Sequence, residues 1–111
     1  NPIYFEFDKA NITNQAAFEL DKLVSIMKKY PKMIIKAESH TDSRGPASYN
    51  KLLSERRAKS TAQYVISKGI DENRISGFGM GEEDPEIDCV SGCSKDEHAK
   101  NRRSEFIIVS R

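Results

Sequence analysis

Two segments with helical spacing, each followed by a short apolar run, restrict the folds open to this chain more than any other feature. In the first, apolar residues recur every three or four positions, as on the buried face of an amphipathic helix. They are Ala17, Leu20, Leu23, Val24 and Met27. Polar capping candidates at 11–14 precede this helix, and Tyr30-Pro31 ends it, because proline cannot continue a helix. A second helix is predicted from about Pro46 to Lys68, ending at Gly69.

Four short segments have the composition of β-strands. Ile3–Phe7 alternates apolar and polar residues, and Met33–Ala37 contains two adjacent isoleucines. Arg74–Phe78 is the third strand, and Glu105–Val109 closes the chain. The resulting order, β-α-β-α-β-β, predicts an α+β fold. We expect a two-layer α/β sandwich with two main helices packed on one face of a mixed sheet.

Between the third and fourth strands the chain is polar and rich in glycine. Gly77–Gly81 lacks the lysine and Ser/Thr of a P-loop and the spacing of a dinucleotide fingerprint. We therefore expect these glycines to relieve a tight bend. Residues 82–100 are predicted to form a long polar loop or a short helix.

Composition limits the classes of protein to which the chain can belong. Its 111 residues fit one domain, 1–111, with a modest core. A net charge of +1 argues against a nucleic-acid binder or a domain that binds anionic membranes. No apolar stretch approaches the roughly 20 residues of a membrane span, so we expect no membrane insertion by this domain. The abrupt start near a strand suggests a domain excised from a longer exported protein.

The two cysteines, Cys89 and Cys93, lie close together with Gly92 between them. Such a pair suits a small disulfide loop in an oxidising compartment. A metal site with His98 as third ligand is an alternative, but the sequence provides no clear fourth ligand. Two free thiols are the remaining possibility. No cofactor is predicted.

One stretch carries the chemistry of a binding site. Asp42 lies on a loop with a glycine, within Ser39–Gly45, and Arg57 lies on the helix that follows. An acid and a guanidinium on separate rigid elements can bind a zwitterion, the acid to its ammonium and the arginine to its carboxylate. The alternative is a surface ion pair at a helix entrance. No nucleophile and base accompany the two residues, so the pattern favours binding over catalysis.

A straight helix from Pro46 would place Arg57 about 16 Å along its axis, at 1.5 Å per residue. Either the Asp42 loop folds back along the helix or the helix is interrupted near Ser54. The turn-forming residues at 43–46 favour the first.

These residues form part of a longer pattern that runs from Ile3 to about Val109. His40–Gly45, Tyr49-Asn50 and Leu53–Ala58 follow one another, with Tyr4–Asp8 before them and Asn101–Phe106 after them. The pattern resembles the OmpA/MotB C-terminal-like family of peptidoglycan-binding domains, which includes the peptidoglycan-associated lipoprotein. Ser39 is a departure, since a glycine is common at this position of the family.

The resemblance implies a ligand and a set of contacts. In the family, the corresponding acid and arginine contact diaminopimelate of the peptidoglycan stem peptide. Carried over, Asp42 binds the ammonium and Arg57 the carboxylate. Thr41, Asn50, Asp8 and Arg102 match other positions of the pocket. Asn50 could instead be a helix-surface amide, Asp8 a turn or cap residue, and Arg102 part of a solvated basic run.

The predicted function is therefore a non-catalytic anchor that ties an outer-membrane or exported parent protein to the cell wall. With the resemblance, a disulfide favours the periplasm. One alternative is an adaptor that binds other envelope proteins. A peptidoglycan hydrolase is the weaker alternative: its carboxylate pair would be Asp42 with Glu38 or Glu55, and nearby arginines lower an acid's pKa rather than raise it.

Overall fold

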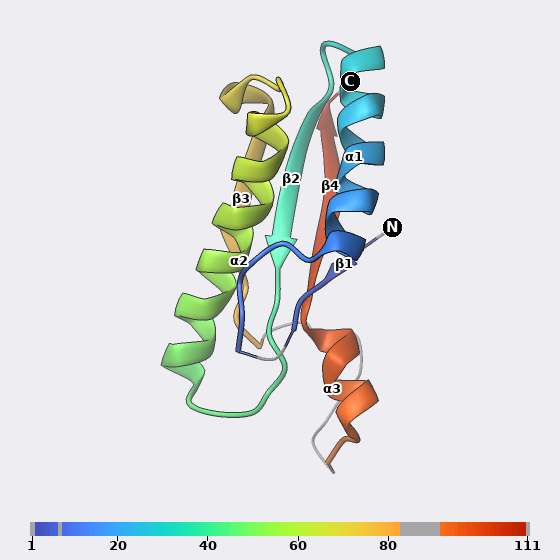
Figure 1. Cartoon of the computed structure of the whole chain (residues 1–111). Helices are drawn as coiled ribbons and strands as arrows, with labels where there is room; N and C mark the ends of the chain where they lie inside the picture. The colour runs from blue at the N-terminus through green and yellow to red at the C-terminus, as the bar shows by residue number, and fades with distance from the viewer. Residues whose placement is uncertain (1, 7, 83–91, 111) are drawn as a thin grey trace.

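The computed structural model describes residues 2–6, 8–82 and 92–110. Figure 1 shows a single sheet with helices in front of it and a short helix at one end. The elements in chain order are β1 (Ile3–Tyr4), α1 (Asn14–Lys29), β2 (Ile34–Ser39), α2 (Ala47–Ser67), a 3₁₀ turn (Glu72–Arg74), β3 (Ile75–Gly79), α3 (Lys95–Asn101) and β4 (Arg103–Ser110).

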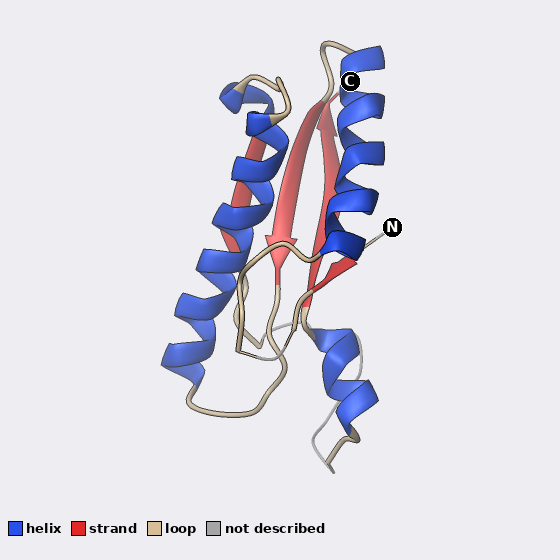
Figure 2. Cartoon of the chain, viewed as in Figure 1, coloured by secondary structure: helices blue, strands red, loops and turns tan. Residues whose placement is uncertain are grey.

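The sheet is mixed, and its last strand lies inside it. The spatial order is β1-β4-β2-β3, with β2 and β3 parallel and β4 antiparallel to both β1 and β2. Helices α1 and α2 lie side by side over one face of the sheet (Figure 2). The predicted two-layer α+β sandwich with two main helices is confirmed.

Helix α1 begins and ends where local chemistry predicts. The Thr13 side chain accepts a hydrogen bond from the backbone N–H of Ala16 at 3.1 Å, which satisfies one of the unpaired donors of the first turn. The helix ends at Lys29, with Tyr30 as its C-cap before Pro31. Its buried residues are Ala16, Leu20, Val24 and Met27. Ala16 therefore takes the place predicted for Ala17, which is only half-buried.

The apolar core lies under α1. Leu20 and Met27 are fully buried against residues of β1, β2 and β3 that include Ile3, Ile35 and Ile75. Each such side chain contributes about 1.5–3 kcal/mol when it leaves water. Burial therefore fixes α1 to the sheet.

Helix α2 contacts β3 through two glycines. A Cβ atom at Gly77 would lie 2.7 Å from the carbonyl oxygen of Ala58, and one at Gly79 would lie 2.5 Å from the backbone nitrogen of Glu55. Both glycines belong to β3. For these two glycines the prediction that they relieve a bend was wrong: they allow the helix backbone to approach the strand. For Gly81 it is confirmed, since this glycine lies in the turn after β3 with a φ of +62°.

Several strand limits differ from the predicted ones. β2 begins at Ile34 and extends to Ser39, two residues beyond the predicted end, and β4 begins at Arg103. β1 is shorter than predicted, although the Phe5 N–H still donates to the Arg102 carbonyl at 2.9 Å. Phe7, the predicted end of that strand, lies outside the described residues.

The segment before β4 contains the short helix α3. Ser94 caps it in a reciprocal arrangement with Glu97, in which each side chain accepts from the other residue's backbone N–H. Cys93 is disulfide-bonded. Cys89 lies outside the described residues, so its pairing with Cys93 stays a prediction. Among the described residues no group of His, Cys, Asp or Glu could hold a metal ion.

The close contact between α2 and β3 makes Gly77→Ala a sensitive test of the packing. The added methyl group would overlap the backbone of Ala58, so we expect the free energy of unfolding to fall by about 1–3 kcal/mol. Ser76→Ala, on the neighbouring exposed position of the same strand, should change it by less than about 0.5 kcal/mol. Chemical denaturation of both variants measures the difference, and equal stabilities would show that α2 is not held this closely.

Candidate functional site

The loop between β2 and α2 folds back along the helix. The Asp42 Oδ1 atom accepts from the Arg44 backbone N–H at 3.0 Å, and Asn50 Nδ2 donates to the Arg44 carbonyl at 3.0 Å. Gly45 has a φ of +86°, which favours glycine. Helix α2 is continuous from Ala47 to Ser67, so the predicted fold-back, not an interrupted helix, places the loop.

A small pocket lies between this loop, the start of α2 and the chain that follows β1. Its volume is about 240 Å³. Its lining residues are Asp8, Thr41, Asp42, Arg44, Gly45, Pro46, Tyr49, Asn50, Leu53 and Arg57. Asp42 and Arg57 therefore line the same pocket, as do Thr41, Asn50 and Asp8.

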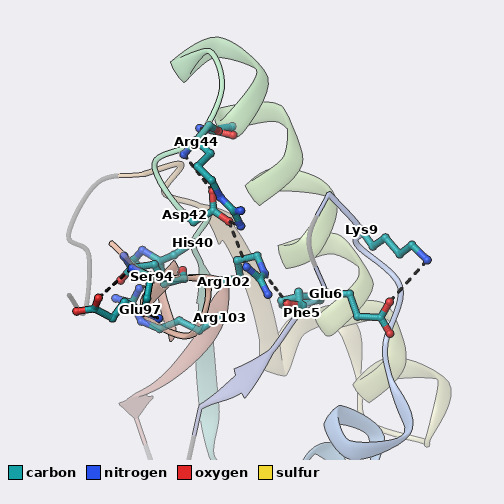
Figure 3. A network of polar contacts seen from close by, with 12 residues as sticks. Phe5, Glu6, Lys9, His40, Asp42, Arg44, Ser94, Glu97, Arg102 and Arg103 are labelled. Atoms are coloured by element: carbon teal, nitrogen blue, oxygen red, sulfur yellow. Dashed lines mark hydrogen bonds and ion pairs between the residues drawn. The ribbon is translucent and has the colours of Figure 1, made fainter. Parts of the chain in front are cut away.

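Asp42 is a buried carboxylate with two arginine partners. Its Oδ2 atom accepts from Arg44 Nη2 at 2.9 Å and from Arg102 Nη1 at 3.3 Å, as Figure 3 shows. Burial acts to raise the pKa of Asp42, but the hydrogen bonds from Arg44 and Arg102 outweigh it and hold the pKa below its usual value. Asp42 is therefore a persistent negative charge.

Arg57 is fully buried, at 0% exposure, and its guanidinium donates hydrogen bonds to backbone carbonyls. Its Nε donates to the Lys9 carbonyl at 2.8 Å, Nη1 to the His40 carbonyl at 3.1 Å, and Nη2 to the Glu6 carbonyl at 3.0 Å. A guanidinium has five N–H groups, so two remain beyond these bonds to the described chain. Arg57 thus ties the segment after β1 to α2 and retains donors for a ligand.

The charge of Arg57 persists at neutral pH. Burial and the neighbouring charge of Arg102 lower the pKa of Arg57 to about 10, while Asp42 and Asp8 act in the opposite direction. The adjacent Arg56 is exposed on the same helix. Burial therefore distinguishes the two arginines, which helical periodicity left undecided.

Arg102 lies beside the pocket and not in a solvated basic run. Its side chain is 13% exposed, and its Nε donates to the Phe5 carbonyl at 2.9 Å. Arg103, the next residue, is buried and pairs with Glu105 at 3.3 Å on β4. Strand β4 is hydrogen-bonded to β2, and Arg102 immediately precedes β4. Arg102 therefore lies near the end of β2, close to Asp42 in the loop that follows.

The remaining predicted residues lie at the pocket wall and rim. Thr41 is 3% exposed, and its Oγ1 atom has no hydrogen-bond partner within the described part of the chain. Asn50 is buried and donates to Arg44 and to the Glu82 carboxylate at 3.2 Å. Asp8 is exposed, with a φ of +58°, and accepts from the Tyr49 hydroxyl.

Two pocket residues with polar side chains were not predicted as site residues. Arg44 contacts Asp42 directly, and Tyr49 holds Asp8 at the rim. The two-residue spacing from Asp42 to Arg44 was a usable signal, since an Asp side chain often binds the backbone two residues on. Nothing local indicated that Tyr49 would reach a residue 41 positions earlier in the chain.

The groups that line the pocket suit binding a charged ligand. Glu38, one candidate partner for Asp42 in acid–base chemistry, pairs instead with Lys36 at 3.1 Å on β2. Glu55, the other candidate, is exposed on α2 and does not line the pocket. The lining combines two acids, two arginines, two hydroxyls and an amide. Such a set can hold an ammonium and a carboxylate at once.

Two larger cavities, of about 530 and 680 Å³, lie beside β1 and the start of α1. They share Tyr4 and residues 13–15 and have mainly apolar walls. Arg102 lines the larger cavity and also pairs with Asp42 at 3.3 Å. Opposite charges converge in the smaller pocket, which we therefore take as the candidate site.

In the part of the chain that the structure describes, no helix has the length and apolar character required to cross a membrane.

Comparisons with known proteins agree with this architecture. A family model described as the OmpA family matches residues 4–102. Outer membrane protein A of Bordetella avium is 39% identical over 106 residues, covering 96% of this chain and 53% of that protein. A peptidoglycan-associated lipoprotein of Pasteurella multocida is 35% identical over 104 residues, covering 94% of this chain and 67% of that protein. The chain thus spans between half and two thirds of these relatives.

A solved structure shares the fold. The crystal structure of the peptidoglycan-associated lipoprotein from Burkholderia pseudomallei has a TM-score of 0.88 at 25% identity, covering 96% of this chain and 88% of that one. The family match spans most of the chain, and the described elements have the arrangement of that relative. This chain belongs to the OmpA family.

Proposed function

We propose that this domain binds peptidoglycan reversibly, without cleaving it, through the diaminopimelate residue of the stem peptide. The observation that carries the proposal is the pocket in which an ionised Asp42 and a charged Arg57 both line one small volume. The free end of diaminopimelate bears an amino and a carboxyl group on one carbon. A pocket of this size, with both charges fixed, matches such a head group.

Each contact follows from the chemistry of its side chain. Asp42 binds the ligand ammonium, and the two remaining N–H groups of Arg57 bind the ligand carboxylate. The buried Thr41 hydroxyl gains the partner that it lacks among the described residues. Asn50 and Asp8 contact the peptide at the pocket wall and rim, and Arg102 holds Asp42 in place.

Binding without catalysis is favoured by the same groups. A general acid needs a raised pKa, whereas the pKa of Asp42 is lowered. The lining residues contain no histidine or cysteine that could act as base or nucleophile. The pocket residues therefore favour a ligand that binds and is released without chemical change.

The names of two relatives support a proposal for the cellular location of the parent protein. One is named for its association with peptidoglycan and another as an outer-membrane protein. The disulfide-bonded Cys93 suits an oxidising compartment. We propose that the domain lies in the periplasm and anchors a longer, outer-membrane-associated parent to the cell wall.

Asp42→Asn tests the acidic half of the pocket. The amide keeps the shape of the side chain but cannot balance an ammonium. Losing one charge of a buried pair costs about 2–5 kcal/mol, so affinity for a diaminopimelate-containing stem peptide should fall roughly 30-fold or more. Isothermal titration calorimetry measures this, with Glu55→Gln on the exposed side of α2 as the matched control. Equal affinities of the two variants would contradict the proposal.

Arg57→Lys tests the basic half. Lysine keeps the charge but lacks the planar fork that reaches three carbonyls. We expect the free energy of unfolding to fall by about 2 kcal/mol, since the carbonyls, among them that of the buried His40, lose this donor. We expect peptide affinity of the folded protein to fall about tenfold. Arg56→Lys is the control at the exposed neighbour; a normal stem-peptide affinity for Arg57→Lys would remove Arg57 from the ligand contacts.

The pH dependence of Asp42 can be measured directly. Because the pKa of Asp42 is below its usual value of 3.8 in the folded protein, the ionised carboxylate adds to stability at neutral pH. That contribution disappears as pH falls through the folded-state pKa. A ¹³C NMR titration of the Asp42 carboxyl should give a midpoint below 3.8, and Arg44→Gln should raise it. A wild-type midpoint at or above 3.8 would show that the arginines do not stabilise the charge.

A further inference from the structure

The carboxylate assigned to a ligand ammonium is already paired within the chain. Arg44 and Arg102 both donate to Oδ2 of Asp42, at 2.9 and 3.3 Å (Figure 3). A ligand ammonium must therefore compete with two arginines for the Asp42 carboxylate. This inference rests on the function proposed above.

The two arginines differ in how firmly they are held. Arg102 is 13% exposed and is also bonded to the Phe5 carbonyl through Nε. The Arg44 side chain is 37% exposed and lines the pocket itself. Of the two, Arg44 is the partner that can leave Asp42 at lower cost, because a partly exposed ion pair contributes little.

The backbone at Arg44 can stay in place when its side chain moves. Its N–H is bound to Asp42 Oδ1 at 3.0 Å, and its carbonyl accepts from Asn50 at 3.0 Å. The next residue, Gly45, has open space where a Cβ atom would be built. Rotation of the Arg44 side chain therefore leaves both anchors of the loop intact.

We propose that Arg44 is a built-in competitor that the ligand ammonium displaces from Asp42, after which the released guanidinium binds the ligand carboxylate beside Arg57. An amine alone gains little from this exchange, since one cation replaces another on Asp42 and the ion pair between Arg44 and Asp42 is lost. A head group with both charges also provides a carboxylate that the released Arg44 guanidinium can bind. Arg44 thus makes the pocket select for the zwitterion, beyond what Asp42 and Arg57 do separately.

Two stem tripeptides that differ only in their third residue test the exchange. One carries diaminopimelate and the other lysine, which has the side-chain ammonium but lacks the carboxylate beside it. The affinities of both are measured by calorimetry for the wild type, for Arg44→Gln, and for Arg56→Gln, which removes the same charge from an exposed position of α2.

The wild type should prefer the diaminopimelate peptide. Without the competing guanidinium, Arg44→Gln should bind the lysine peptide about fivefold more tightly than the wild type does, and the diaminopimelate peptide no more tightly. Arg56→Gln should shift both affinities by the same factor. An unchanged ratio of the two affinities in Arg44→Gln would overturn the proposal, as would weaker binding of the lysine peptide.

The exchange has a second readout that does not depend on the variant. The ¹⁵N signal of the Arg44 Nε–H group should shift on saturation with the diaminopimelate peptide, while that of Arg102 changes little. A static Arg44 signal with normal binding would overturn the exchange and leave the proposed function standing. A folded wild-type protein that binds neither peptide would overturn the proposed function, and the exchange with it.

Discussion

The guanidinium of Arg57 is the interaction on which both the scaffold and the pocket depend. It is buried under the loop that follows β2 and donates to backbone carbonyls of Glu6, Lys9 and His40. Removing the guanidinium would take a donor from each of these carbonyls, at a cost of about 1–3 kcal/mol where the carbonyl is buried, as at His40. The same bonds hold the positive charge in place before any ligand arrives, so little ordering remains to be done on binding.

A line of hydroxyl groups continues from Arg57 into the interior. Thr61 Oγ1 donates to the Arg57 carbonyl at 2.8 Å and lies 3.1 Å from Ser104 Oγ, which lies 2.5 Å from Ser39 Oγ. These residues belong to α2, β4 and β2, and all are buried. The domain thus has an apolar half under α1 and a more polar half under α2, where small residues allow close approach. The pocket lies at the end of the polar half, on elements that cannot shift independently.

Local patterns predicted much of this arrangement. Periodicity, the capping candidates at 11–14 and Pro31 indicated the first helix, and turn chemistry indicated the return of the Asp42 loop. The ion pair between Asp42 and Arg102 could not be predicted in this way, because the two residues are 60 positions apart in the chain. They meet only because β4 lies next to β2 in the sheet. The role of Gly77 was misread for the same reason: only the tertiary contact with α2 explains it. Ligand roles of the pocket residues stay predictions.

The position of β4 between β1 and β2 has a consequence for how the domain is made. Until the last strand is available, β1 has no neighbour in the sheet, and Arg102 cannot reach Asp42. A nascent chain that still lacks β4 therefore has neither a complete sheet nor the ion pair between Arg102 and Asp42. Folding must await the whole domain, since contacts so distant in sequence form only after the intervening chain is released. Synthesis of the residues that line the pocket and formation of the ion pair between Arg102 and Asp42 are consequently separate events.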